Sequence, residues 1–148
     1  MKLFKVAALA AIVVSGSALA GMFPQYGGDH GNGNQSGPDS TMSIYQYGSG
    51  NNATALQSDA RKSDLTIKQF GSSNGADVGQ GSDSSTIDLL QKGTANNATI
   101  SQWNSKNSDI QVQQFGALNG AVVHQTASDS SVTVHQVGFG NHASASQY

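Results

Sequence analysis

The sequence has 148 residues, of which 11% are charged and 36% are hydrophobic, and its formal net charge is −2. Ser, Gly, Gln and Asn fill 64 positions, all nine acidic residues are Asp, and Cys is absent. This composition disfavours an amphipathic helical bundle and a highly charged disordered chain, and it excludes a disulfide scaffold and a thiolate metal site. A chain rich in Asn and Gln and low in net charge is instead typical of stacked β-structure, and without a basic surplus nucleic acid is not expected as a partner.

Residues 1–20 have the pattern of a secretory signal peptide. Lys2 and Lys5 precede an apolar run over 6–14, and small residues follow up to Ala18 and Ala20. The apolar run is shorter than the roughly 20 residues of a transmembrane helix. The sequence therefore predicts a secreted protein whose mature chain begins at Gly21.

Residues 21–39 form a Gly/Asn-rich leader. The segment has six Gly, both Pro of the chain and no hydrophobic periodicity. Such a stretch buries too little apolar surface to offset its backbone entropy. It is either an address for secretion or a plain flexible spacer.

Residues 40–148 consist of five repeats of the pattern Ser-x5-Gln-x4-Asn-x5-Gln. We place them at 40–62, 63–84, 85–107, 108–129 and 130–148. The pattern holds at every marker position: Ser40, Gln46, Asn51, Gln57, Ser63, Gln69, Asn74, Gln80, Ser85, Gln91, Asn96, Gln102, Ser108, Gln114, Asn119, Gln125, Ser130, Gln136, Asn141 and Gln147. A regular repeat of this length predicts a stacked architecture.

Apolar residues alternate along each half of a repeat, as at Met42 and Ile44 or at Ala53 and Ala55. A period of two predicts strands with one buried face, and a Gly at a fixed place between the two halves predicts a sharp bend. The expected fold is all-β: a cross-β solenoid, disordered before assembly, whose five strand–turn–strand repeats stack into two parallel sheets with rungs about 4.8 Å apart. The markers fall on the same alternate positions as the apolar residues, so their side chains are expected to point into the core. Identical amides of successive rungs are then expected to form hydrogen-bonded ladders.

The distribution of charge differs between the end repeats and the middle ones. Neither 40–57 nor 130–148 contains Asp, Lys or Arg. Residues that oppose self-pairing, termed gatekeepers, fall in the middle repeats: Asp64, Asp77, Asp88, Asp109, Gly75 and Gly79. Soluble repeat proteins protect their terminal strands with polar caps, and this pattern is the opposite. The sequence therefore predicts end-to-end polymerisation.

Five such repeats after a signal peptide and a Gly/Asn-rich leader resemble the curlin family of Gram-negative enteric bacteria, in particular its major-subunit type. The resemblance implies an extracellular functional amyloid, a fimbrium of the biofilm matrix that serves surface adhesion and cell aggregation. It further implies export through the periplasm and a dedicated outer-membrane pore with accessory chaperones, nucleation by a minor curlin, and contact with host matrix proteins. The residues that drive seeding in the family correspond to Gln46, Asn51, Gln136 and Asn141. The leader departs from the family in carrying Asp29 and Asp39.

Two alternatives stay open at this stage, a minor curlin nucleator and a monomeric β-solenoid adhesin. A minor curlin usually has a basic last repeat, whereas 130–148 contains no Lys or Arg, and the adhesin would need end caps and a regular outward ladder. No cofactor or metal is expected, because His124, His135 and His142 lack ligand spacing. No GxSxG nucleophile motif occurs, so we expect no catalytic residues and no enzymatic activity.

Overall fold

The computed structural model describes residues 10–13, 40–58 and 60–148, and their regular secondary structure is entirely β. The strands are β1 Ala10–Val13, β2 Thr41–Ser49, β3 Asn52–Gln57, β4 Asp64–Ser72, β5 Gly75–Asp83, β6 Thr86–Thr94, β7 Asn97–Lys106, β8 Asp109–Ala117, β9 Gly120–Gln125, β10 Ser131–Phe139 and β11 His142–Gln147. The predicted signal peptide, apart from β1, and the predicted leader lie outside the described residues. No helix of membrane-spanning length and hydropathy occurs among the residues described.

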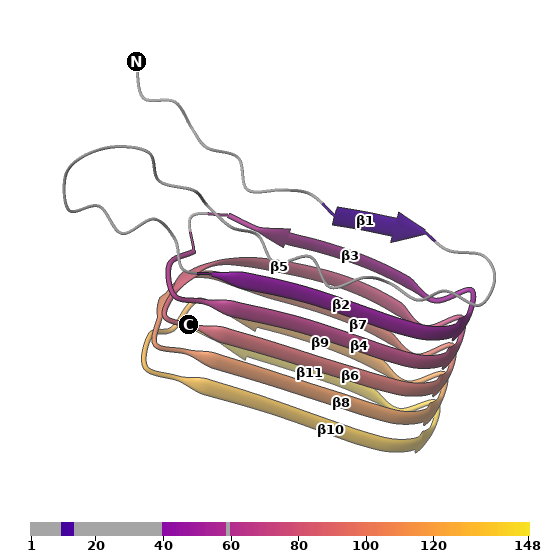
Figure 1. Ribbon diagram of the computed structural model, residues 1–148. Helices are drawn as coiled ribbons and strands as arrows, with labels where there is room; N and C mark the ends of the chain where they lie inside the picture. Colours follow the sequence, from indigo (N-terminus) through magenta and orange to yellow (C-terminus); the bar gives the residue numbers. More distant parts are fainter. Residues whose placement is uncertain (1–9, 14–39, 59) are drawn as a thin grey trace.

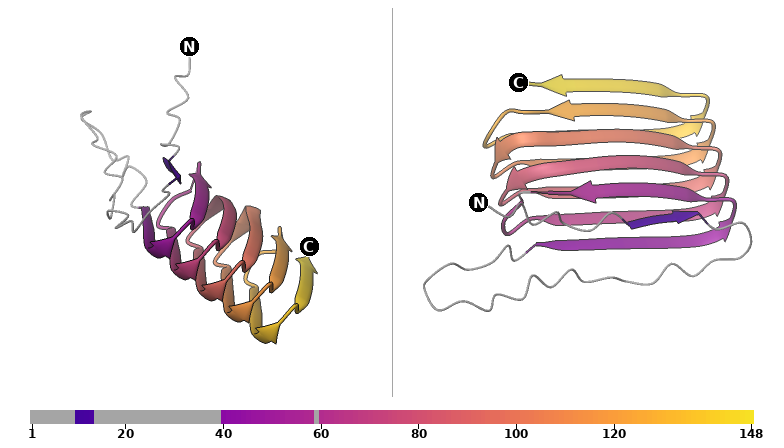
Figure 2. Two further views of the ribbon diagram at one scale, coloured as in Figure 1. Left: turned by 90° about the vertical axis from the view of Figure 1, so that its right-hand side faces the viewer. Right: turned by 90° about the horizontal axis from the view of Figure 1, so that it is seen from above.

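Each repeat contributes one strand to each of two facing sheets (Figure 1). One sheet has the order β1-β3-β5-β7-β9-β11 and the other has the order β10-β8-β6-β4-β2. All pairs between repeats are parallel, whereas β1 pairs with β3 in antiparallel fashion. The rungs follow one another along a single axis in sequence order (Figure 2). The predicted fold, a β-solenoid of five strand–turn–strand repeats, is confirmed.

The sequence period fixes the register between rungs. Gln46 pairs with Gln69 and Gln57 pairs with Gln80, so equivalent positions of neighbouring repeats lie side by side. The inward apolar side chains form one continuous core between the sheets. Its best buried members are Ala53, Ala55, Leu65, Ile67, Val78, Ile87, Leu89, Ala98, Ile100, Ile110, Val112, Ala121 and Val123. In the first sheet the column beside the Asn markers is Ala in every rung, so larger Ile, Leu, Val and Met side chains of the opposite sheet fill the space between them.

The bend within each repeat depends on the fixed Gly. In the second repeat Gly71 has a φ of 114°, and a Cβ atom there would overlap the carbonyl oxygen of Gly93 on the next rung. Both the backbone angle and the close approach therefore require glycine. The strands run through this bend and end later than the alternation predicts, because bend residues such as Gly48 and Gly71 still pair in parallel register.

Candidate assembly interface

Two continuous ladders of Gln side chains run along the core. In one ladder each Nε2 donates to the Oε1 of the next repeat, from Gln46 to Gln69 at 2.6 Å and from Gln69 to Gln91 at 2.8 Å. The contacts continue from Gln91 to Gln114 and on to Gln136, both at 2.8 Å. The second ladder joins Gln57, Gln80, Gln102, Gln125 and Gln147 in the same direction, at 2.8 to 3.1 Å. Stacking thus satisfies amides that would be costly to bury alone.

The Asn ladder runs in the opposite direction. The backbone N–H and the Nδ2 of Asn74 both donate to Asn51 Oδ1 at 3.0 Å, in the preceding repeat. Asn96, Asn119 and Asn141 repeat this arrangement on the Asn before them. The Nδ2 of Asn74 also donates to the carbonyls of Phe70 and Gly93, which ties the bend to the core. Each Asn therefore closes its own bend and links two rungs.

The Ser markers use their hydroxyl groups differently. Ser40 Oγ accepts the backbone N–H of Ser63 at 3.1 Å, and Ser63 Oγ accepts that of Ser85 at 3.2 Å. The same contact joins Ser85 to Ser108 and Ser108 to Ser130. The hydroxyls of Ser40, Ser63 and Ser108 also donate to a carbonyl in the connection that ends their own repeat, for example Ser63 to Ser82, whereas Ser85 donates to Asp83 in the connection before it. The column thereby holds the start of each repeat against its neighbour.

The two end rungs expose complementary halves of these ladders. The Oε1 atom of Gln46 is buried and has no hydrogen-bond partner within the described residues. At the other end, Gln136 Nε2 donates only to the carbonyl of Gly120, and Asn141 is exposed. The four residues predicted to drive seeding, Gln46, Asn51, Gln136 and Asn141, thus belong to the first and last rungs of the two faces of the core.

The predicted acidic gatekeepers lie on the outward faces. Asp64, Asp77 and Asp109 are exposed or largely so, and Asp64 accepts a hydrogen bond from Thr41 at 2.5 Å. Asp88 is only half-exposed, and its Oδ1 atom is buried without a hydrogen-bond partner in the described part of the chain. An unpaired buried acceptor costs free energy, so Asp88 is the least well accommodated of the four acidic gatekeepers.

The predicted glycine gatekeepers, Gly75 and Gly79, lie beneath side chains of the third repeat. A Cβ atom at Gly75 would lie 2.7 Å from Asn97 Oδ1, and one at Gly79 would lie 2.8 Å from Trp103 Cζ2. Sequence reasoning treated these glycines as weak points and did not pair them with their neighbours. The constant repeat spacing carried the necessary signal, because it aligns each position with its equivalent on the next rung.

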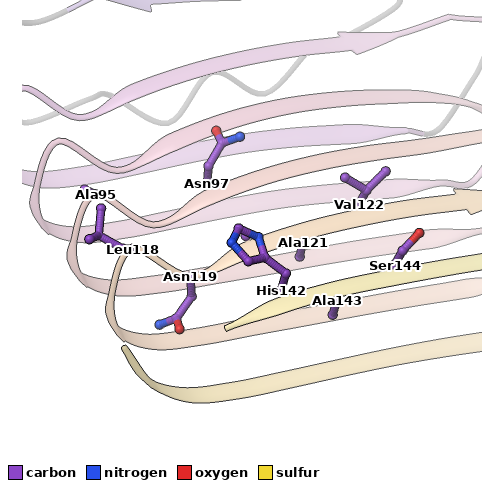
Figure 3. Close-up of a pocket in the computed structure, with 10 residues that line it drawn as sticks. Ala95, Asn97, Leu118, Asn119, Ala121, Val122, His142, Ala143 and Ser144 are labelled. Carbon is purple, nitrogen blue, oxygen red and sulfur yellow. The ribbon is translucent and has the colours of Figure 1, made fainter. Parts of the chain in front are cut away.

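The outer surface carries aromatic contacts and one shallow groove. Tyr45 lies 5.4 Å from Phe70 and Phe115 lies 5.7 Å from His135 between ring centroids. The groove, shown in Figure 3, lies between Asn97 and His142 where Gly120 has no side chain, and Leu118 and Val122 line it. Nothing in the repeat pattern singled it out. Among the residues described, His and Asp side chains form no group that could hold a metal ion.

Comparison with known proteins agrees with this geometry. The family model of the curlin associated repeat matches residues 37–81, 82–116 and 106–138. The chain is 71% identical over 87 residues to the major curlin subunit of Salmonella typhimurium (strain LT2), covering 57% of this chain and 58% of that protein. It is 68% identical over 86 residues to the major curlin subunit of Escherichia coli (strain K12), covering 56% of this chain and 57% of that protein.

The chain thus matches between one half and two thirds of the length of these curated relatives. The repeat matches, by contrast, span 37–138 and so cover most of the five rungs, including all members of the Gln and Asn ladders except Asn141 and Gln147. Since the family model covers well over half of the sequence and the fold repeats as the family pattern requires, the chain belongs to the curlin associated repeat family.

Proposed function

We propose that this protein is a non-enzymatic structural subunit that polymerises into extracellular curli amyloid fibres, which serve the biofilm matrix, surface adhesion and cell aggregation. The relatives named major curlin subunit support this role. The observation that carries it is the direction of the ladders: donors and acceptors left over at one end of the solenoid match those left over at the other.

The matching follows from the individual contacts. Every Gln donates towards the next repeat, so a further rung placed before the first would donate to the buried Oε1 of Gln46. The last rung of a second copy offers that donor in Gln136 Nε2. Every Asn after the first donates to the Oδ1 of the Asn in the preceding repeat, so Asn51 of one copy faces Asn141 Oδ1 of the other. Once removal of residues 1–20 takes away β1, which pairs with β3, a first rung on a last rung continues all three amide ladders.

The opposite arrangement leaves the ladders broken. If two first rungs met, Gln46 Oε1 would face a second Oε1, and neither atom can donate. Each unpaired buried acceptor costs about 1–3 kcal/mol. Head-to-tail growth with the same parallel register as the rungs within one chain is therefore the favoured mode.

Export and nucleation complete the proposal. Residues 1–20 are the signal peptide and 21–39 are the address that an outer-membrane secretion pore recognises, with accessory chaperones keeping the chain unfolded before export. A minor curlin nucleator supplies the first template rung at the cell surface. Host matrix proteins are further partners of the finished fibre.

The test is to follow the purified chain 21–148 by thioflavin fluorescence and fibre diffraction. We expect a soluble, disordered start, a lag, and fibres with reflections near about 4.8 and 10 Å. A soluble monomer with strand-rich circular dichroism that persists for days at micromolar concentration would refute the polymer and favour the monomeric adhesin. A chain that accelerates a related subunit while failing to elongate itself would refute the bulk role and favour the nucleator.

A further inference from the structure

The only Trp of the sequence lies on a strip of glycine. Trp103 on β7 is in register with Gly81 on β5, and its indole also reaches Gly79. A Cβ atom at Gly79 would lie 2.8 Å from Trp103 Cζ2, and one at Gly81 would overlap Trp103 Cε3 and Cζ3. The ring therefore occupies the space where the outward side chains of residues 79 and 81 would otherwise stand.

No other rung of the chain has room for this ring. The same two positions hold Leu56 and Ser58 on the first rung, and Ser101 and Trp103 itself on the third. On the fourth and fifth rungs they hold His124 with Thr126 and Ser146 with Tyr148. Only the second rung presents two glycines there, so only it accepts the indole without a clash.

A second contact in the same strand pair has the same form. Asn97 of the third rung leans over Gly75 of the second, and His142 of the fifth rung leans over Gly120 of the fourth. Asn97 could therefore seat on the second or the fourth rung. Trp103 removes this ambiguity, because its two positions are glycine on the second rung alone.

We propose that Trp103 and the glycines Gly79 and Gly81 form a steric lock that fixes the third rung on the second, and that Trp103 is a register-determining residue for assembly. The inference rests on the proposed function. The lock fixes the register of β7 on β5, two strands that otherwise resemble their equivalents in the other repeats. It assigns Gly79 and Gly81 a role as the seat of the indole, which opposes the expectation that such glycines slow polymerisation.

The two roles predict opposite signs. If the glycines only weaken the strand, Gly81→Ala raises β-propensity and shortens the lag, with or without Trp103. If they seat the indole, Gly81→Ala displaces the ring and lengthens the lag by about threefold or more, since docking of this pair precedes growth. In a Trp103→Ala background the same substitution has space and no longer lengthens the lag. The comparison is thus a double-mutant cycle, in which each glycine substitution is measured with and without Trp103 and the Trp103→Ala background is the control.

The experiment uses chain 21–148 with thioflavin lag times for the parent, Gly79→Ala, Gly81→Ala, Trp103→Ala and the combined variants. Tryptophan emission of the assembled material provides a second readout. In parent fibres we expect emission shifted to the blue of the soluble chain and reduced acrylamide quenching, and in Gly81→Ala material we expect both changes to be lost. If a single variant does not assemble, recovery in the combined variant supports the lock.

Equal shortening of the lag by Gly81→Ala in both backgrounds would overturn the lock, as would unchanged Trp103 emission in Gly81→Ala fibres. These outcomes are distinct from a failure of the proposed function, because that failure would appear as a parent chain that forms no fibres at all.

Discussion

The roles of end rungs and middle rungs separate when matched amide pairs are removed. We compare Gln136→Ala with Asn141→Ala in the fifth repeat against Gln91→Ala with Asn96→Ala in the third. Both double variants delete one Gln and one Asn of the same ladders, and both leave the apolar core intact. The comparison therefore varies only the position along the solenoid.

Within one chain the middle pair costs more. The side chains of Gln91 and Asn96 take part in three and five hydrogen bonds, whereas those of Gln136 and Asn141 take part in two each. At about 1 kcal/mol net per bond, the loss is about 8 kcal/mol for the middle pair and about 4 kcal/mol for the end pair. Neighbouring losses are not independent, so these figures are upper bounds and their order is the useful quantity.

Seeding should show the reverse order. Growth adds a first rung to a last rung, and the end pair removes the Gln136 donor and the Asn141 acceptor that a new copy would meet. We expect the end pair to slow elongation from parent seeds by about tenfold or more, because a buried amide is left unpaired in the docking step. The middle pair presents unaltered end rungs and should elongate faster than the end pair.

The assay is seeded thioflavin growth combined with the guanidinium concentration that dissolves half of the fibres. We expect the two double variants to rank in opposite order in the two measurements. The end-pair variant should grow more slowly from seeds, and fibres of the middle-pair variant should dissolve at a lower guanidinium concentration. Equal seeded rates for the two pairs would refute the special role of the ends while leaving the solenoid intact.

Three further substitutions test separate parts of the structure. Changing Asp64, Asp88 and Asp109 to Asn should shorten the lag. Asp88→Asn alone should account for most of this change, because the buried Oδ1 of Asp88 lacks a partner. Lag times of the three single variants check this order, and a larger effect of Asp64→Asn would contradict it. Gly71→Ala should prevent assembly under conditions in which Gly140→Ala only delays it. Both glycines have a positive φ, but only at Gly71 does a carbonyl oxygen occupy the place of a Cβ atom. Equal delays for the two variants would show that the backbone angle alone matters. Replacing 21–39 with an unrelated flexible sequence should abolish surface display and leave fibre growth in vitro unchanged, as measured on cells and on purified chain; normal display would make the leader a spacer.

The fold could be predicted from the sequence because a two-residue alternation and a repeat of 22 or 23 residues occur together in it. The alternation at Leu65 and Ile67 defines a strand with one buried face, and the repeat of 22 or 23 residues aligns that strand with its copies. The burial of Gln69 was accessible for the same reason, since an amide on the apolar parity needs an identical neighbour on each side. Strand ends were less accessible: the bend at Gly71 breaks the side-chain alternation but not the backbone pairing between rungs.

Two features of the candidate interface were out of reach of the pattern alone. Alternation places Gln69 and Asn74 inside, but the direction in which each amide donates depends on side-chain torsions, and Gln and Asn donate in opposite directions along the same axis. The pairing of β1 with β3 likewise joins a segment outside the repeats to one inside them, and no period relates the two.

The opposed directions of the ladders have a consequence for how the chain ends recognise each other. A single ladder would give each end one kind of unpaired group. Here the first rung presents an acceptor in Gln46 Oε1 and an Asn51 that has no preceding Asn Oδ1 to donate to, and the last rung presents the Nε2 of Gln136 with an acceptor in Asn141 Oδ1. Both ends therefore carry both kinds of group in different columns, and the two ends match only when rung order and strand direction continue. Identical polar side chains, which in most cores would reduce stability, here select one docking geometry, because every alternative leaves at least one buried amide without its partner.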